Sequence, residues 1–260
     1  MPVWTDAHNH LQDARLGDAA PVIAAMREAG IERCVVNATC EGDWSAVEQL
    51  ANAHPGFVIP AFGIHPLWVE TARDGWQSRL AILLEKHSQA SIGECGLDQR
   101  EESPSISIQL PVFIDQLRLA REMNRPLTIH CVKAWSPLFE AFAEQAPPKF
   151  LMHSFGGSIE IAHRLIPLGG YFSFSGHFLH PQKHAVIEVF RKLPLERILL
   201  ETDAPDKPPP DEFTSHPLPK NHNHPANLVT VGHALAAALA MPPDALARLT
   251  HENAARCFGL

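Results

Sequence analysis

The chain has 260 residues, of which 45% are hydrophobic and 19% are charged, and its formal net charge at pH 7 is −8. This composition is typical of a folded globular protein, and it excludes a disordered chain. The length is enough for one large α/β domain or two small ones. No apolar run reaches the roughly 18 residues of a membrane-spanning helix, and the negative charge argues against a general nucleic-acid coat, because phosphate binding requires a positive field.

Eight short runs rich in β-forming residues recur along the chain. The predicted strands span 3–8, 33–38, 57–63, 90–94, 126–131, 149–153, 170–174 and 197–203. Helical patterns separate these strands and follow the last one. Eight strands, each followed by a helix, predict an α/β fold, a TIM (β/α)8 barrel, as a single domain over 1–260.

The predicted helices have recognisable cap residues. Asp43 and Ser158 fit N-cap positions, and Gly30 fits a C-cap position. The helices are predicted over 19–29, 43–53, 76–87, 105–123, 135–144, 159–168, 181–193, 225–240 and 243–257.

A proline-rich stretch over 205–225 follows the eighth predicted strand and is far longer than a usual connection. In a barrel this position places it over the mouth. We therefore interpret it as a lid or a substrate-contacting loop, with a plain surface linker as the alternative.

The first predicted strand carries polar side chains near its carboxyl end. The sequence TDAHNHL at 5–11 places Asp6, His8 and His10 at every second position. In an extended strand alternate residues point the same way, so these three would share one face. Such a face suggests a ligand set, although histidines in this spacing also occur in ordinary surface or core roles.

Further metal-binding side chains end the later strands. Because the carboxyl ends of barrel strands meet at one mouth, we expect all of them to lie close together. Imidazole and carboxylate ligands suit zinc, manganese or iron, and six of them exceed the three protein ligands of a catalytic zinc. Two metal ions are therefore the expected count. The predicted metal ligands are His8, His10, Glu94, His130, His153 and Asp203.

Each predicted ligand has an ordinary alternative when it is taken alone. Glu94 could be an exposed loop acid, and Asp203 could cap a helix. Each histidine could be a core residue with satisfied hydrogen bonds. All of these explanations would have to hold at once, which favours a shared metal site.

The chain resembles the TatD family of metal-dependent hydrolases, which are amidohydrolase-like barrels. The similarity spans nearly the full length and consists of an ordered set of motifs. These are TDAHNHL at 5–11, GIHP at 63–66, GECGLD at 93–98, TIH at 128–130, HSFGGS at 153–158, ETDAP at 201–205, NHPANL at 223–228 and THENAARCFG at 250–259.

The resemblance implies two divalent metal ions, such as Zn, Mg or Mn, that share one carboxylate. The first ion would be held by His8, His10, Glu94 and Asp203. The second would be held by Glu94, His130 and His153.

The resemblance also implies an activity, because family members act as DNases on single strands or 3′ ends. We predict a hydrolase of ester bonds, namely a deoxyribonuclease or phosphodiesterase that uses a metal-activated water. Its partner would be nucleic acid or a small phosphoester. The alternatives are an ester or amide hydrolase, such as a D-aminoacyl-tRNA deacylase, and a non-enzymatic metal-binding protein.

Catalytic and substrate-binding roles are expected at the same mouth. Asp203 is the candidate general base, and Glu94 is the carboxylate on which turnover depends. His65, in the GIHP turn, is predicted to contact the scissile phosphate, or else to have only a structural role in the turn. Further positive groups that could bind the phosphate or the leaving group are Lys133, Arg100 and His177.

The sequence departs from the family in its basic residues. Val132 stands where the family usually has an arginine, with Lys133 beside it, and the segment before NHPANL retains Lys220 as its one basic residue besides histidines. Less positive charge at the mouth weakens the prediction of a long nucleic-acid substrate, and it leaves the metal prediction unchanged.

The expected environment is the cytoplasm. Five cysteines without a C-x-x-C pair are typical of reduced thiols, and no basic-then-apolar leader precedes the first motif. We also expect no membrane association and a monomeric state.

Overall fold

The structure, a computed structural model, describes residues 3–260. Its strands form one eight-stranded sheet in which each strand pairs in parallel with the next along the chain. The strands are β1 (Trp4–Asn9), β2 (Ile31–Asn37), β3 (Val58–Phe62), β4 (Ser91–Asp98), β5 (Leu127–Val132), β6 (Phe150–Met152), β7 (Gly170–Ser175) and β8 (Ile198–Glu201).

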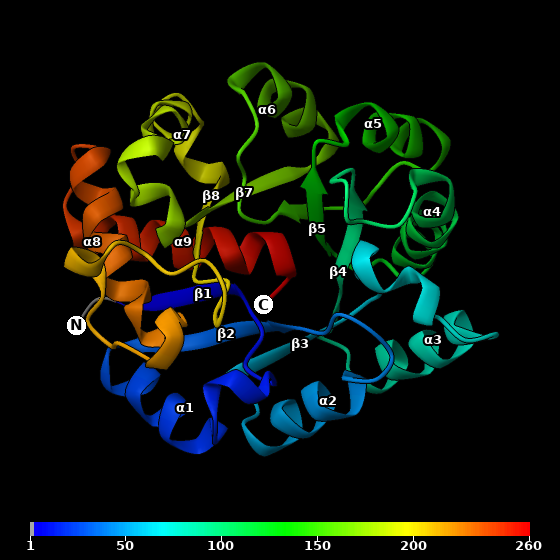
Figure 1. The fold of residues 1–260 in the computed structure, drawn as a ribbon, viewed down its shortest axis with the longest axis horizontal. Coiled ribbons are helices and arrows are strands. Elements are labelled where there is room, and N and C mark those ends of the chain that lie inside the picture. Colours follow the sequence, from blue (N-terminus) through cyan, green and yellow to red (C-terminus); the bar gives the residue numbers. More distant parts are fainter. Residues whose placement is uncertain (1–2) are drawn as a thin grey trace.

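Helices surround this ring of strands (Figure 1). The α-helices are α1 (Ala19–Glu28), α2 (Trp44–Ala53), α3 (Trp76–Lys86), α4 (Ile106–Glu122), α5 (Trp135–Glu144), α6 (Ile159–Leu165), α7 (His184–Phe190), α8 (Leu228–Ala238) and α9 (Pro243–Phe258). The short 3-10 helices are η1 (Ala14–Leu16), η2 (Pro66–Thr71), η3 (Ile166–Leu168), η4 (Gly176–Leu179), η5 (Pro181–Lys183), η6 (Leu195–Arg197), η7 (Asp211–Phe213), η8 (Pro219–Asn221) and η9 (Pro225–Asn227). The predicted TIM barrel is confirmed.

The barrel closes where the chain leaves β8 and meets β1. The backbone N–H of Asp203 donates to His8 O at 3.0 Å, and the N–H of His10 donates to Ala204 O at 2.8 Å. Asp6 reinforces this seam, because it accepts hydrogen bonds from the backbone N–H of Thr202 at 3.0 Å and from its hydroxyl at 2.6 Å. The seam therefore fixes three of the predicted metal ligands relative to one another.

Asp6 does not join those ligands. The pairing of β1 with β2 is irregular between Asp6 and Asn9, which breaks the strict alternation that the sequence suggested. As a result, the Asp6 carboxylate bonds to Thr202 and to the Asn9 side chain. The expectation that Asp6 shares a ligand face with His8 and His10 is wrong for this reason.

The core has two parts. The larger one lies between the strands and the surrounding helices, where apolar side chains of both pack together. A smaller cluster lies inside the barrel, where Ala7, Leu151 and Leu199 pack with Ala254 and Phe258 of α9. Helix α9 thus contacts the barrel interior, and it packs against β1, β6 and β8.

Several element boundaries differ from the predicted ones. Strand β4 continues to Asp98, and β8 ends at Glu201, two residues before the expected end. The predicted helix over 159–168 becomes α6 followed by η3, because Pro167 has no N–H to continue the α-helical ladder. The helices expected over 181–193 and 225–240 likewise begin as the 3-10 turns η5 and η9, each with proline first.

The predicted caps have different outcomes. Ser158 accepts from the N–H of Ile161, as expected of an N-cap. Asp43 occupies the N-cap position of α2, but its carboxylate accepts from Thr39 instead of the helix. Gly30 lies one residue beyond Ala29, the C-cap of α1, and has a φ of +89°.

The proline-rich stretch 205–225 contains two complete 3-10 turns, η7 and η8, and ends at the start of η9. Asn223 ties it to the barrel, because its side-chain amide donates to Thr202 O at 2.8 Å and its N–H donates to Pro205 O at 2.9 Å. Over residues 3–260, each helix is too short or too polar to cross a bilayer.

Candidate metal centre

The six predicted metal ligands meet at the carboxyl ends of the barrel strands. They come from β1, β4, β5 and the residues just after β1, β6 and β8. Five of the six are buried, and His130 is half-buried. The predicted ligands that the structure brings together are His8, His10, Glu94, His130, His153 and Asp203.

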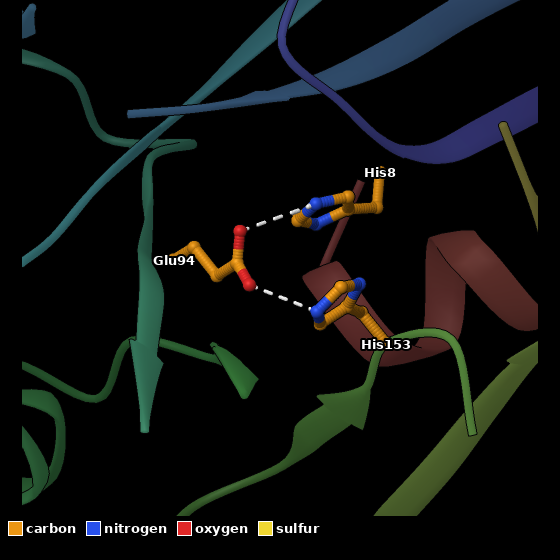
Figure 2. A group of neighbouring side chains, drawn as sticks. All are labelled: His8, Glu94 and His153. Carbon is orange, nitrogen blue, oxygen red and sulfur yellow. Dashed lines mark ion pairs between the residues drawn. The ribbon is translucent and has the colours of Figure 1, made fainter. Parts of the chain in front are cut away.

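Glu94 lies between two groups of these side chains. Its Oε2 atom is 3.4 Å from the Nε2 atoms of both His8 and His10. Its Oε1 atom is 2.8 Å from His153 Nε2 and 3.0 Å from His130 Nδ1. Figure 2 shows this arrangement for His8 and His153, toward which the two carboxylate oxygens point separately. A carboxylate with one oxygen on each side has the geometry of a bridging ligand.

The group on the Oε2 side is completed by Asp203. Its Oδ1 atom is 3.3 Å from His8 Nε2 and 3.5 Å from His10 Nε2. The two histidine nitrogens are themselves 3.2 Å apart. Asp203 follows the end of β8 with a φ of +55°, in the left-handed region where aspartate is among the tolerated residues.

The group on the Oε1 side contains His130 and His153, and His65 lies beside it. The facing nitrogens of His130 and His153 are 3.2 Å apart. His65 Nε2 is 3.3 Å from Glu94 Oε1, so this side carries three imidazoles around one oxygen. His65 is the N-cap of η2, and Gly63 and Ile64 separate it from the end of β3.

Hydrogen bonds on the far side of two rings set their tautomers. His10 Nδ1 donates to Asn37 O at 2.8 Å, and His130 Nε2 donates to Asp98 Oδ2 at 2.9 Å. In its neutral form each ring therefore turns an unprotonated nitrogen toward the centre, and this is the form that binds metal ions. Asp98 is held in turn by the Arg100 guanidinium at 2.6 Å.

His65 has the opposite arrangement. Its Nδ1 accepts from the N–H of Leu67 at 3.1 Å, so the neutral ring carries its hydrogen on Nε2, the atom that faces Glu94. Burial lowers the pKa of His65 to about 4, which keeps the ring neutral at pH 7. This ring is therefore a hydrogen-bond donor at the centre.

The charges at the centre are mutually dependent. Burial opposes the charge of Glu94, but the nearby imidazoles, His153 first, hold the pKa of Glu94 well below its usual range. Burial also opposes the charge of His153, yet Glu94 and Glu201 outweigh it and raise the pKa of His153 to about 10. Buried carboxylates of this kind require positive charge beside them. A divalent cation supplies that charge to neutral imidazoles and carboxylates, so the donor set fits a metal ion.

A cavity of about 700 Å³ opens from this centre. Arg100 lines it, but its guanidinium is already bonded to Asp98. Over residues 3–260 the lining includes neither Lys133, which is exposed with a φ of +54°, nor His177 in η4. Burial, with Lys207 and Lys183 nearby, lowers the pKa of His177 to about 4. Of the proline-rich stretch, Asp206 and Lys207 line the cavity.

Sequence reasoning missed two supporting carboxylates. Asp98 bonds to His130, and Glu201 lies 3.6 Å from His153 Nδ1 and accepts a hydrogen bond from Ser154 Oγ at 2.6 Å. Strand alternation does not relate Glu201 to Asp203, because Asp203 lies beyond the end of β8 with a left-handed φ. Asp98 does follow from alternation along β4, since it is four residues after Glu94. That signal was available in the sequence.

Comparisons with known proteins agree on one family. A family model described as "TatD related DNase" matches residues 5–259. The chain is 30% identical over 259 residues to the uncharacterized metal-dependent hydrolase YabD of Bacillus subtilis, with 97% of this chain and 98% of YabD covered. It is 31% identical over 248 residues to the 3'-5' ssDNA/RNA exonuclease TatD of Pantoea ananatis, with 94% of each covered.

A solved structure gives the same result. The crystal structure of YjjV, a TatD homologue from Escherichia coli, superposes with a TM-score of 0.90 at 27% identity. The match covers 99% of this chain and 98% of YjjV.

Proposed function

The chain belongs to the TatD-related DNase family of metal-dependent hydrolases, and we propose that it uses two divalent ions to hydrolyse phosphodiester bonds in single-stranded DNA. The proposal extends to bonds at 3′ ends. The observation that carries it is the position of Glu94, whose two oxygens face two separate groups of nitrogen and oxygen donors.

The two ions would occupy the two sides of the Glu94 carboxylate. His8, His10 and Asp203 would complete the first site, and His130 and His153 the second. Divalent ions bound there would lower the pKa of a water molecule and polarise a phosphoryl oxygen. Zn, Mg and Mn are all compatible with imidazole and carboxylate ligands in this number.

Asp203 would act as the general base. Its carboxylate lines the cavity, and its pKa lies well below the usual range, where hydrogen bonds from His10 and His8 outweigh the effect of burial. An ionised carboxylate at this place can accept a proton from the attacking water.

His65 would bind the phosphate. Its Nε2 carries a hydrogen and faces the centre, and its ring lines the cavity. A neutral donor of this kind can hydrogen-bond a phosphoryl oxygen as negative charge develops there. Of the other groups expected to bind substrate, Arg100 lines the cavity and would contribute from its wall, whereas Lys133 and His177 do not line it.

The charge of the cavity favours short substrates or chain ends. Arg15 and Arg100 both line it, but the first is paired with Asp13 and Asp206 and the second with Asp98. Few cations are therefore left for a long run of phosphates.

The direct test compares substrates on the metal-reconstituted enzyme. The protein is stripped with a chelator, reloaded with Zn, Mn or Mg, and given single-stranded DNA labelled at either end, duplex DNA or D-aminoacyl-tRNA. We expect shortening of the single strand from its 3′ end with at least one metal. The proposal would be contradicted if the metal-loaded protein hydrolysed only the aminoacyl ester, or if it hydrolysed none of these substrates.

A further inference from the structure

Two apolar side chains are exposed on the wall of the cavity that contains the metal centre. Leu67 is 37% exposed and Trp68 is 47% exposed, and both line the cavity. The other large apolar side chains with comparable exposure, among residues 3–260, are Ile82, Ile108, Leu168 and Leu195, which lie on α3, α4, η3 and η6 and do not line it.

The turn that carries Trp68 is fixed to the centre. The Trp68 N–H donates to His65 O at 2.8 Å, and the Thr71 hydroxyl donates to Trp68 O at 2.7 Å. Pro66 and Val69 of the same turn are buried, so they anchor it while the indole faces outward. His65, three residues earlier, faces Glu94 at 3.3 Å. The indole is therefore held on a rigid support next to the reacting groups.

Trp68 differs from the other tryptophans of the chain. Trp4, Trp44 and Trp76 are buried, and the half-buried Trp135 packs edge-on against Phe155. Within residues 3–260, Trp68 has no aromatic neighbour that would cover its ring. An indole left bare beside a cluster of charged groups is the kind of apolar surface that marks a binding site.

We propose that Trp68, with Leu67 beside it, stacks on a base of the single-stranded substrate at the nucleotide next to the scissile phosphate. This inference rests on the proposed function. An aromatic ring accepts any base, because every base has a π face, and it holds the base without a cation in a cavity whose two arginines are already paired. The cavity of about 700 Å³ is large enough for a nucleotide. Stacking on Trp68 then selects nucleic acid over small phosphodiesters.

The experiment uses W68A, W68F and a control, I82A, in the metal-loaded enzyme. Ile82 is 62% exposed on α3 and lies away from the cavity lining, so I82A removes a comparable apolar surface elsewhere. Each variant is assayed on a single-stranded oligonucleotide and on an oligonucleotide of equal length that lacks its terminal bases. We expect W68A to raise KM for the first substrate at least about fivefold and to leave the second unchanged. W68F should retain most of the affinity, and I82A should behave as wild type.

Tryptophan fluorescence supplies a readout that is independent of turnover. Single-stranded DNA added to the protein in excess chelator should quench the emission of the wild type, and W68F should lose that part of the quenching. In the activity assay, an equal rise in KM for both oligonucleotides in W68A would indicate a structural role and overturn the inference. The inference would also be overturned if W68A left KM for the single-stranded oligonucleotide unchanged and W68F left the quenching unchanged.

The two proposals fail in different ways. If the wild-type enzyme cleaves oligonucleotides and W68A cleaves them equally well, only the stacking inference is overturned. Wild-type enzyme that cleaves no oligonucleotide under any metal overturns both.

Discussion

At the scale of single residues, Glu94 and the hydrogen bonds behind its partners decide the chemistry. Glu94 is buried, and its two oxygens contact different sets of histidines, two at Oε2 and three at Oε1. His10 and His130 are oriented in turn by Asn37 O and by Asp98. Changes at either level should therefore act on metal binding first and on turnover through it.

The first prediction concerns Glu94 itself. E94Q keeps the size of the side chain but removes the negative charge shared by both proposed ions. We expect turnover to fall by more than about 100-fold. Changing a residue that only orients a metal ligand typically costs up to about 100-fold, and Glu94 would itself be a ligand. Elemental analysis after reconstitution should show less bound metal, while circular dichroism should report an unchanged fold. Full activity together with full metal content would contradict the bridging role.

The second prediction concerns Asp98, which accepts from His130 Nε2 at 2.9 Å. D98N replaces the carboxylate with a neutral amide that can turn either its oxygen or its N–H toward His130, so the tautomer of His130 is held less firmly and its ring becomes less basic. Metal affinity or activity should fall about 10-fold to 100-fold. The matched control is D115N, because Asp115 pairs with Arg118 on the surface of α4. Equal behaviour of D98N and D115N would show that Asp98 does not act through His130.

At the scale of elements, the sequence predicts the order of strands and helices and the alternation of side chains along each strand. It does not predict features that depend on a tertiary contact or on a proline. Alternation and strand order predict that His8, Glu94 and His130 lie at one mouth of the barrel. They could not place Asp6, because the irregular pairing after it turns its carboxylate to Thr202. They also do not predict that the Arg100 guanidinium bonds to Asp98, since that ion pair depends on a side-chain conformation.

The third prediction tests the seam between β8 and β1. Thr202 donates its hydroxyl to the buried Asp6 at 2.6 Å. T202V has the same shape but no hydroxyl, so the Asp6 Oδ2 atom keeps only the Asn9 amide as a donor, and the Ala204 N–H loses its acceptor in a buried site. The free energy of unfolding should fall by about 1–3 kcal/mol in denaturant titrations. A loss below about 0.5 kcal/mol would mean that the seam does not depend on this bond.

The fourth prediction concerns acid stability at the end of the proline-rich stretch. His224 Nδ1 accepts from the N–H of Ala226 at 3.0 Å, and burial lowers the pKa of His224 to about 4. Between pH 6.5 and about 4 the unfolded chain therefore binds more protons at this position, so its contribution to stability falls as the pH falls. H224N can still cap η9 but does not titrate. We expect H224N to lose about 1–2 kcal/mol less than wild type between pH 7 and pH 4.5. Parallel pH profiles of the two proteins would exclude this role.

At the scale of the whole molecule, charge and metal content set how the enzyme meets its substrate. The net charge is −8, and Arg15 and Arg100 at the cavity are paired with carboxylates. Binding should therefore depend on contacts at the mouth more than on a long positive track. The fold itself follows from regular alternation of strands and helices, which is why its class could be predicted from the sequence.

The fifth prediction follows from this charge distribution. The logarithm of the affinity for single-stranded DNA should fall with the logarithm of salt concentration with a slope no steeper than about −2, equivalent to about three phosphate contacts. Fluorescence titrations between low and moderate salt measure it. A slope of about −5 or steeper would require a phosphate track that the paired arginines do not provide.

The most direct test of the central claim is to locate the ions in crystals by anomalous scattering after reconstitution with zinc or manganese. We predict two peaks on opposite sides of the Glu94 carboxylate, one beside His8 and His10 and the other beside His153. A single peak, or peaks that do not contact Glu94, would contradict the account.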